Sequence, residues 1–167
     1  MALTIYHEDL KRHPEAVQYF NDFRATRSEL ARKLFTYFNA TAFGNRLPES
    51  LEIELNFQLW IPSGTTHTAE RIEDGSRYAK IFLSVRHNEN PERLRDTLIH
   101  EMCHVAAWLI DGSDCPIDGG HGPCWQKWAE HAQSVHPNII IQRFERNVTY
   151  TDFLYKCGDC GCDIGEN

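Results

Sequence analysis

Two histidines four residues apart, His100 and His104, lie within a run of apolar and helix-forming residues. On a helix, this spacing places both imidazoles on the same face, one turn apart. Glu101 directly follows the first histidine. In this H-E-x-x-H pattern the two imidazoles can bind one zinc ion, and the carboxylate can act as a general base on a zinc-bound water. The pattern therefore predicts a hydrolytic centre with Zn²⁺ as cofactor and Glu101 as catalytic base.

The third zinc ligand must come from elsewhere, because a catalytic zinc site uses three protein ligands and keeps a fourth position open. One zinc-protease pattern takes a histidine six residues after the second ligand, but Ile110 occupies that position. The two remaining candidates are Glu130, on a following predicted helix, and His121, after Gly119-Gly120. We favour His121, because imidazole suits zinc and glycine permits the sharp turn that would bring the ring back to the metal.

A structural zinc site, or a chance match with two surface histidines, is the competing interpretation of the pattern. A closed structural site normally has four ligands and often uses cysteine. Cys103 lies between the two histidines but on another side of the predicted helix, so we expect it to be a small buried packing residue. We therefore favour the catalytic interpretation.

The elements that position these residues are predicted from hydrophobic periodicity and from helix start and stop signals. Asn90 can cap the helix that carries the histidines, with Pro91 at its first position. The polar segment 61–75 is expected to be a loop or hairpin. The order of helix, strand, strand, helix, helix and strand predicts an α+β fold. The predicted helices cover 14–38, 91–110 and 123–135, and the predicted strands cover 51–60, 78–85, 139–144 and 153–155.

The composition predicts one compact domain: 167 residues, of which 41% are hydrophobic and 25% charged. The formal net charge of −7 argues against binding nucleic acid over the whole surface, but not against a local basic groove. Several basic side chains are expected merely to solvate helix faces. The residues that could line a groove are Arg86, Arg93, Arg95, Lys127, Arg143, Arg146 and Lys156.

No signal peptide or membrane-spanning stretch is recognisable, so we expect no membrane association. The six cysteines are accordingly expected in a reducing compartment, buried or bound to metal rather than paired in disulfides. Cys157 and Cys160 form a C-x-x-C knuckle, which supplies two zinc thiolates. A zinc ribbon needs a second pair, and no further C-x-x-C pair follows in this sequence. Free thiols in a disordered tail are the alternative.

Several segments together resemble the SprT-like metalloprotease family. The resemblance covers roughly residues 20–160, and its most specific parts are 93–104, 107–110, 120–123 and Trp125. It implies a zincin-like α+β fold in which a helix-borne H-E-x-x-H packs against a small antiparallel sheet. It also implies that His100, His104 and His121 bind zinc and that Glu101 is the general base. The implied organisation is an N-terminal extension (1–15), a SprT-like metalloprotease domain (16–152) and the first half of a zinc ribbon (153–167).

The resemblance further implies a task, which is the DNA-dependent cleavage of proteins covalently crosslinked to DNA. Single-stranded or junction DNA would be the activator, the protein would be a chromatin-associated nuclear monomer, and the complete ribbon would hold a second, structural Zn²⁺. A zinc peptidase that is independent of DNA and a catalytically silent chromatin-binding module are the alternatives. The chain departs from the family pattern in the polar continuation after Trp60 and in an insertion at 113–117.

Overall fold

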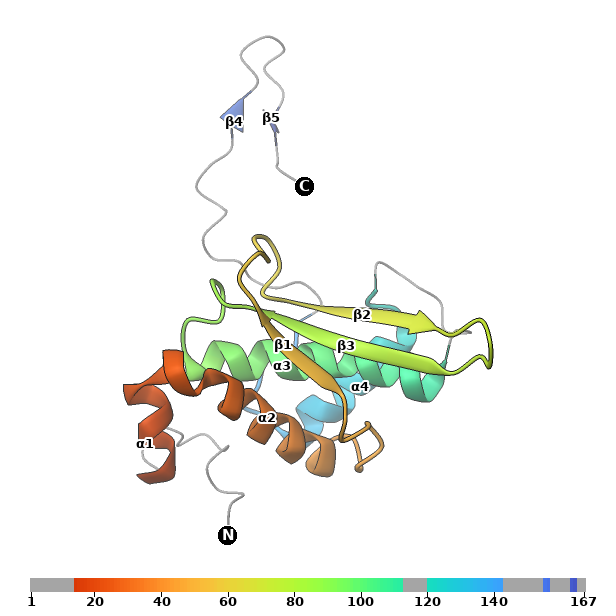
Figure 1. The fold of residues 1–167 in the computed structure, drawn as a ribbon, viewed down its shortest axis with the longest axis horizontal. Coiled ribbons are helices and arrows are strands. Elements are labelled where there is room, and N and C mark those ends of the chain that lie inside the picture. Colours follow the sequence, from red (N-terminus) through yellow and green to blue (C-terminus); the bar gives the residue numbers. More distant parts are fainter. Residues whose placement is uncertain (1–13, 113–119, 143–154, 157–162, 165–167) are drawn as a thin grey trace.

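The computed structural model describes residues 14–112, 120–142, 155–156 and 163–164 (Figure 1). Its helices are α1 (Pro14–Asn21), α2 (Phe23–Thr41), α3 (Pro91–Ala106) and α4 (Pro123–Val135). A three-stranded sheet contains β1 (Glu52–Asn56), β2 (Gly64–Glu70) and β3 (Arg77–Ser84), in the order β1-β3-β2. Figure 1 shows α3 running behind the sheet. Helices and a small sheet in this arrangement confirm the predicted α+β class.

The sheet is mixed, so the prediction of an antiparallel sheet was wrong. β2 pairs with β3 in antiparallel fashion, but β1 runs parallel to β3. The parallel pairing of β1 with β3 arises because segment 61–75 contains an additional strand, β2, at the edge of the sheet beyond β3. After β1 the chain crosses to this edge and then returns as the central strand. β2 is rich in threonine and lacks an apolar alternation, which is why its sequence did not predict a strand.

The predicted helix over 14–38 is two helices, which is a second correction. Asp22 separates them, with φ −134° and ψ 52°, outside the helical region. Its carbonyl accepts hydrogen bonds from the backbone N–H and the hydroxyl of Thr26, at 3.1 and 2.8 Å. Buried residues on both sides of the break, Tyr19 and Phe23, continue the hydrophobic periodicity through it. Periodicity alone therefore did not predict the break.

The helix that carries the histidines begins as predicted. The Asn90 side chain accepts a hydrogen bond from the Arg93 backbone N–H at 2.9 Å, and Pro91 takes the first helical position. The α-helical part ends at Ala106, and a π-helical turn, η3 (Ala107–Asp111), follows. Gly112, with φ 95°, ends this turn where the sequence predicted the helix to stop.

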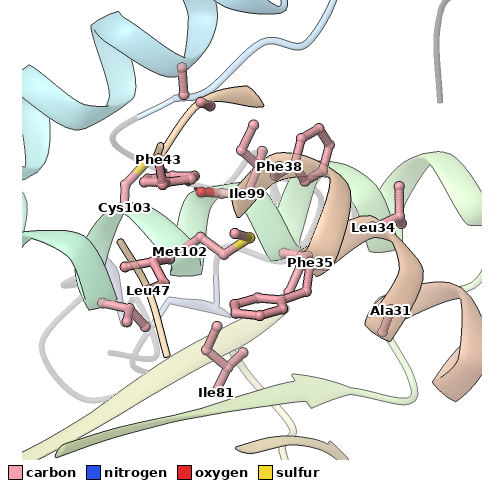
Figure 2. Packing of buried hydrophobic residues seen from close by; sticks show 14 of the residues in the cluster. Ala31, Leu34, Phe35, Phe38, Phe43, Leu47, Ile81, Ile99, Met102 and Cys103 are labelled. Atoms are coloured by element: carbon pink, nitrogen blue, oxygen red, sulfur yellow. Dashed lines mark hydrogen bonds between the residues drawn. The ribbon is translucent and has the colours of Figure 1, made fainter. Parts of the chain in front are cut away.

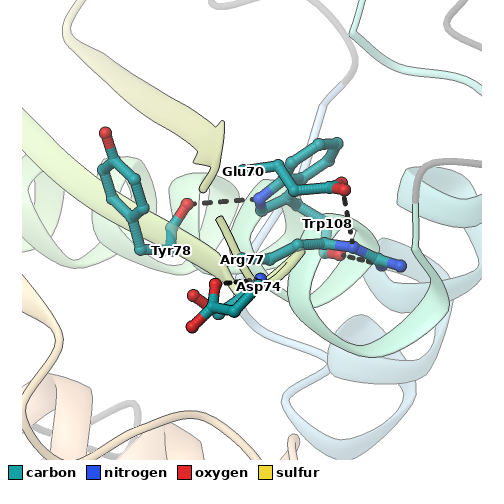
Figure 3. A network of polar contacts seen from close by, with 6 residues as sticks. Glu70, Asp74, Arg77, Tyr78 and Trp108 are labelled. Atoms are coloured by element: carbon teal, nitrogen blue, oxygen red, sulfur yellow. Dashed lines mark hydrogen bonds and ion pairs between the residues drawn. The ribbon is translucent and has the colours of Figure 1, made fainter. Parts of the chain in front are cut away.

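A polar network attaches η3 to the sheet (Figure 3). Arg77, at the start of β3, donates to the Trp108 carbonyl at 3.2 Å and forms an ion pair with Glu70 at 3.7 Å. The Trp108 indole donates to the Tyr78 carbonyl at 3.2 Å. Gly112 has φ 95°, which favours glycine, and a Cβ atom there would lie 2.5 Å from the Arg77 guanidinium and displace it. The end of the histidine helix is thereby held against β3.

The hydrophobic core lies between the sheet and the helices (Figure 2). Ile99 and Met102 of α3 and Phe35 and Phe38 of α2 are almost fully buried, and Ile81 reaches the same cluster from β3. In Figure 2 the Phe35 ring lies between Met102 and Ile81. This packing fixes the buried side of α3 and so determines the direction in which its other side points.

The last helix, α4, has the bounds that were predicted for it. Residues 139–142 form no strand, although strand 139–144 was predicted; Ile139 and Ile141 are buried and Ile140 is exposed, which imitates strand alternation. Further along, β4 (Tyr155–Lys156) pairs antiparallel with β5 (Asp163–Ile164). The ribbon cysteines, the N-terminal extension before residue 14 and the insertion at 113–117 lie outside the described residues.

None of the helices in the described ranges combines the length and the apolar character that a membrane crossing requires.

Candidate metal centre

The first two histidines of the pentad face the same way, as predicted. His100 and His104 lie one turn apart on α3, with their Nε2 atoms 3.3 Å apart and their ring centroids 5.1 Å apart. His100 is buried and His104 is partly exposed. The pair therefore points toward one small region at the surface of the helix.

His121 reaches this region from a segment that is distant along the chain. Its Nε2 lies 3.0 Å from the Nε2 of His100. Gly120 precedes it with φ 81°, a left-handed conformation that favours glycine, so the hinge has the role that the sequence suggested. One donor atom from each of the three histidines lies within 4.8 Å of the others, and in the described part of the chain this is the group that could hold a metal ion. Glu130 is exposed on α4 and does not belong to it.

The rings of the α3 pair carry no charge at neutral pH. Burial, and then the neighbouring His121, lower the pKa of His100 to about 4. Burial, followed by His100 and His121, lowers the pKa of His104 to about 3. A metal ligand must be a neutral imidazole, so this environment suits a metal and disfavours a bound proton.

Backbone groups orient both rings. The backbone of Gln142 hydrogen-bonds the His100 ring, and the backbone of Gly120 hydrogen-bonds the His104 ring. Because these bonds raise the pKa of each ring, a carbonyl oxygen accepts from a ring N–H. The Nε2 atoms converge, so the carbonyls engage the other ring nitrogen, and the Nε2 lone pairs face one another. Metal-binding histidines in proteins are typically oriented in this way, and the donor set fits a zinc ion.

Trp125 lies against all three histidines. Its ring centroid is 4.9 Å from His100, 5.6 Å from His104 and 4.5 Å from His121. Its indole N–H donates to the His100 carbonyl at 3.4 Å. From the sequence, Trp125 was identified only as part of the family resemblance. No spacing rule links a tryptophan to a metal site, so its position depends on how α4 packs against α3.

Glu101 is buried beside the histidines, with 3% of its surface exposed. The Thr66 hydroxyl, from β2, lies 2.7 Å from its carboxylate Oε2 and 3.2 Å from its backbone carbonyl. Gly64 packs closely on the same side chain: an added Cβ atom there would lie 2.7 Å from Thr97 and 2.8 Å from Glu101 Cγ. Sequence reasoning missed Thr66 and Gly64 because it did not predict the strand that carries them.

Of the two cysteines near the site, one is a buried free thiol and the other is disulfide-bonded. Cys103 is fully buried and its thiol donates to the Ile99 carbonyl at 3.2 Å, which confirms the predicted packing role. Burial, and then the neighbouring Glu101, raise the pKa of the Cys103 thiol. Cys124, on α4, is disulfide-bonded. The expectation that every cysteine is reduced, buried or metal-bound was therefore wrong for Cys124.

Several of the basic residues suggested for a DNA groove contact other residues of the chain. Lys127 pairs with Asp111 at 2.6 Å, and Arg95 pairs with Asp96 at 2.6 Å. Arg86 is exposed and lies over an aromatic ring, and Arg93 donates to the His87 carbonyl at 3.5 Å. Arg143 and Arg146 lie outside the described residues, as does the side chain of Lys156.

Comparison with known proteins adds sequence relationships to this geometry. The model of the SprT-like family matches residues 31–148. Germ cell nuclear acidic protein from Homo sapiens is 32% identical over 86% of this chain, and the protein of that name from Drosophila melanogaster is 30% identical over 87%. An HMG box-containing protein from Schizosaccharomyces pombe is 30% identical over 80%. The matched regions span only 20%, 13% and 38% of these three relatives, respectively.

Proposed function

The chain belongs to the SprT-like family, and from this membership and its converging histidines we propose that it is a zinc-dependent endopeptidase that cleaves proteins covalently crosslinked to DNA. The observation that carries the proposal is the site itself. One nitrogen from each of the three imidazoles lies within 4.8 Å of the others. Glu101, which directly follows His100, is a buried glutamate that accepts a hydrogen bond from Thr66 of β2. A binding module would have no use for a general base beside a metal.

His100, His104 and His121 would be the zinc ligands, which leaves one coordination position open. When bound there, Zn²⁺ supplies a Lewis acid that polarises the scissile carbonyl and lowers the pKa of a water molecule. The rings of His100 and His104 are held in advance by the backbone of Gln142 and Gly120, and Trp125 contacts all three rings. Little reorientation of the ligands is therefore needed.

Glu101 would accept the proton of the attacking water and deliver it to the leaving amine. Thr66 donates to one of its two carboxylate oxygens and so limits rotation of the carboxylate. The close approach of Gly64 keeps the side chain from swinging toward β2. These contacts support a base that is held in one orientation while the proton moves.

The DNA-related part of the proposal is supported by the family and by the names of the relatives. Two relatives are named as nuclear proteins, which supports a nuclear, chromatin-associated location. Another is named for an HMG box, a module that binds DNA in the minor groove. We expect the metalloprotease domain to cover 16–152, to act as a monomer and to be activated by single-stranded or junction DNA. Cys157 and Cys160 would belong to a second, structural Zn²⁺ site.

A zinc peptidase that does not depend on DNA is the second candidate. The net charge of −7 favours it, since the whole-molecule field repels phosphate. Two of the basic residues suggested for a DNA groove also favour this candidate. Lys127 pairs with Asp111 and Arg95 pairs with Asp96, so neither cation is free to contact phosphate alone.

Cleavage of a protein–DNA crosslink separates the candidates. The zinc-loaded chain is incubated with the crosslink, with and without added single-stranded DNA, beside Glu101→Gln and Glu130→Gln. We expect cleavage by the wild type and by Glu130→Gln, stimulation by DNA, and at least a hundredfold slower cleavage by Glu101→Gln, because general base catalysis contributes about 10²–10⁴-fold. Equal rates for wild type and Glu101→Gln would exclude the peptidase proposal. Rapid cleavage that DNA does not change would favour the second candidate.

A further inference from the structure

The loop between β1 and β2 exposes two aromatic side chains next to arginines. Phe57 and Trp60 lie between β1 and β2, with 67% and 61% of their surfaces exposed, which is unusual for large apolar residues. Arg86, in the loop after β3, lies over the Trp60 ring with its guanidinium carbon 3.6 Å from the ring centroid. Arg27 of α2 lies over the Phe57 ring at 5.7 Å. We call these four residues the Trp60 surface.

Hydrogen bonds hold the two loops together. The Ser84 hydroxyl donates to the Leu59 carbonyl at 2.8 Å, and a ring nitrogen of His87 lies 2.8 Å from the Trp60 carbonyl. The side-chain amide of Asn88 donates to the Ser63 and Ser84 carbonyls, each at 2.8 Å. Ser84 and Asn88 are fully buried. These buried hydrogen bonds hold the loop that carries the exposed rings in one conformation.

The local charge of the Trp60 surface differs from that of the whole chain. The nearest acids on β1, Glu52 and Glu54, are both paired with Lys80, at 2.9 and 2.8 Å. Glu89 follows the second loop and is exposed. The surface itself carries two guanidinium groups and no carboxylate. Its charge is therefore positive although the chain has a net charge of −7.

Exposed rings beside arginines suit unpaired nucleobases, since bases stack on aromatic faces while guanidinium groups contact phosphates. We propose that the Trp60 surface binds single-stranded DNA, with a base stacked on Trp60 and the backbone held by Arg86 and Arg27. The choice of DNA rests on the proposed function. A buried apolar anchor would favour a protein partner instead, but here the rings are exposed and interleaved with charge.

The position of the surface gives it a connection to the metal centre. The loop that carries Trp60 continues directly into Gly64, which packs on Glu101. DNA bound at the Trp60 surface would thus lie beside the strand that orients the general base. A protein attached to that DNA would be held close to the site that cleaves it.

Fluorescence anisotropy of a labelled oligo(dT) of about 12 nucleotides tests the proposal on the full chain. Trp60→Ala is expected to weaken binding about fivefold to a hundredfold, the range for loss of one base–aromatic stack. Trp60→Phe should largely restore affinity. Arg86→Ala should weaken binding and lower the salt dependence by about one phosphate contact.

Two variants provide matched controls. Tyr78→Ala removes an exposed aromatic ring at the opposite end of β3. Arg46→Ala removes another arginine that lies over a tryptophan, Trp128, at 5.6 Å. Both should bind oligo(dT) as the wild type does, and a duplex of equal length should bind more weakly than the single strand.

Several results would overturn the proposal: equal affinity of wild type and Trp60→Ala, equal binding of duplex, or tighter binding of the matching RNA. Loss of protein-substrate affinity in Trp60→Ala without any oligonucleotide binding would identify a peptide surface instead. Glu101→Gln should bind oligo(dT) normally. Trp60-dependent binding without cleavage would therefore leave this inference standing and exclude the proposed function, while cleavage without such binding would do the reverse.

Discussion

At the residue scale, Glu101 shows how a charged group is kept inside a small domain. A carboxylate with 3% exposure loses most of its hydration, so it needs hydrogen-bond donors from the protein. The Thr66 hydroxyl is one such donor, at 2.7 Å from Oε2. Because Thr66 lies on the edge strand β2, the orientation of the proposed base depends on a strand outside the helix that carries it.

Replacing Thr66 with valine keeps the side-chain shape and removes the hydroxyl. We expect Thr66→Val to slow substrate cleavage by about tenfold or more, since a hydrogen bond to a charged group is worth about 1.5–3 kcal/mol. The effect should fall on kcat rather than KM, and zinc content should be unchanged. Steady-state kinetics with metal analysis measures both. Thr66→Ser, which retains the hydroxyl, should keep most of the activity; wild-type kcat in Thr66→Val would refute the positioning role.

At the element scale, the end of the histidine helix is joined to α4 by one side chain. Asp111, the last residue of η3, accepts from the Trp128 indole at 2.7 Å and pairs with Lys127 at 2.6 Å. The two contacts are not equivalent. Trp128 is buried, whereas the Lys127 side chain is 58% exposed. The indole bond should therefore dominate, because exposed ion pairs contribute little.

Denaturant unfolding of two variants can separate these contacts. Asp111→Ala is expected to lower the free energy of unfolding by about 1–3 kcal/mol, because it leaves the Trp128 indole N–H without its acceptor. Lys127→Ala is expected to cost less than about 1 kcal/mol. Equal losses in the two variants would show that the ion pair, and not the indole bond, attaches η3 to α4.

At the scale of the whole molecule, the three histidines come from two separate parts of the chain that meet at one place. His100 and His104 belong to α3, while His121 precedes α4. A metal ion held by all three would link these parts in the folded state and not in the unfolded chain. Metal binding should therefore appear as stability of the entire domain.

Removal of zinc with a chelator tests this linkage by thermal unfolding. We expect chelation to lower the Tm of the wild type, since a ligand present at about a thousand times its Kd adds about 4 kcal/mol of stability. In His121→Ala the shift on chelation should be much smaller. His131→Ala, which removes an exposed histidine of α4, is the control and should show the wild-type shift. An unchanged wild-type Tm would contradict a metal centre at these histidines.

Features that follow from spacing within one element were predictable from the sequence alone. A four-residue step on a helix brings His100 and His104 to one face, and the Asn90 cap and the stop at Gly112 are read from local hydrogen-bonding and backbone preferences. The Gly-Gly hinge made His121 a better candidate than Glu130, although spacing could not place either residue at the metal.

Which distant segments surround the pentad depends on how the elements pack in three dimensions. Thr66 and Glu101 are 35 residues apart, and Trp125 reaches all three rings from another helix. The strand that carries Thr66 has a polar sequence because it is an edge strand, and it becomes a strand through pairing with β3. Such contacts depend on how buried side chains fill the space between elements, which no periodicity within a single segment encodes. The sequence could therefore predict a zinc centre, while packing between elements determined what contacts Glu101.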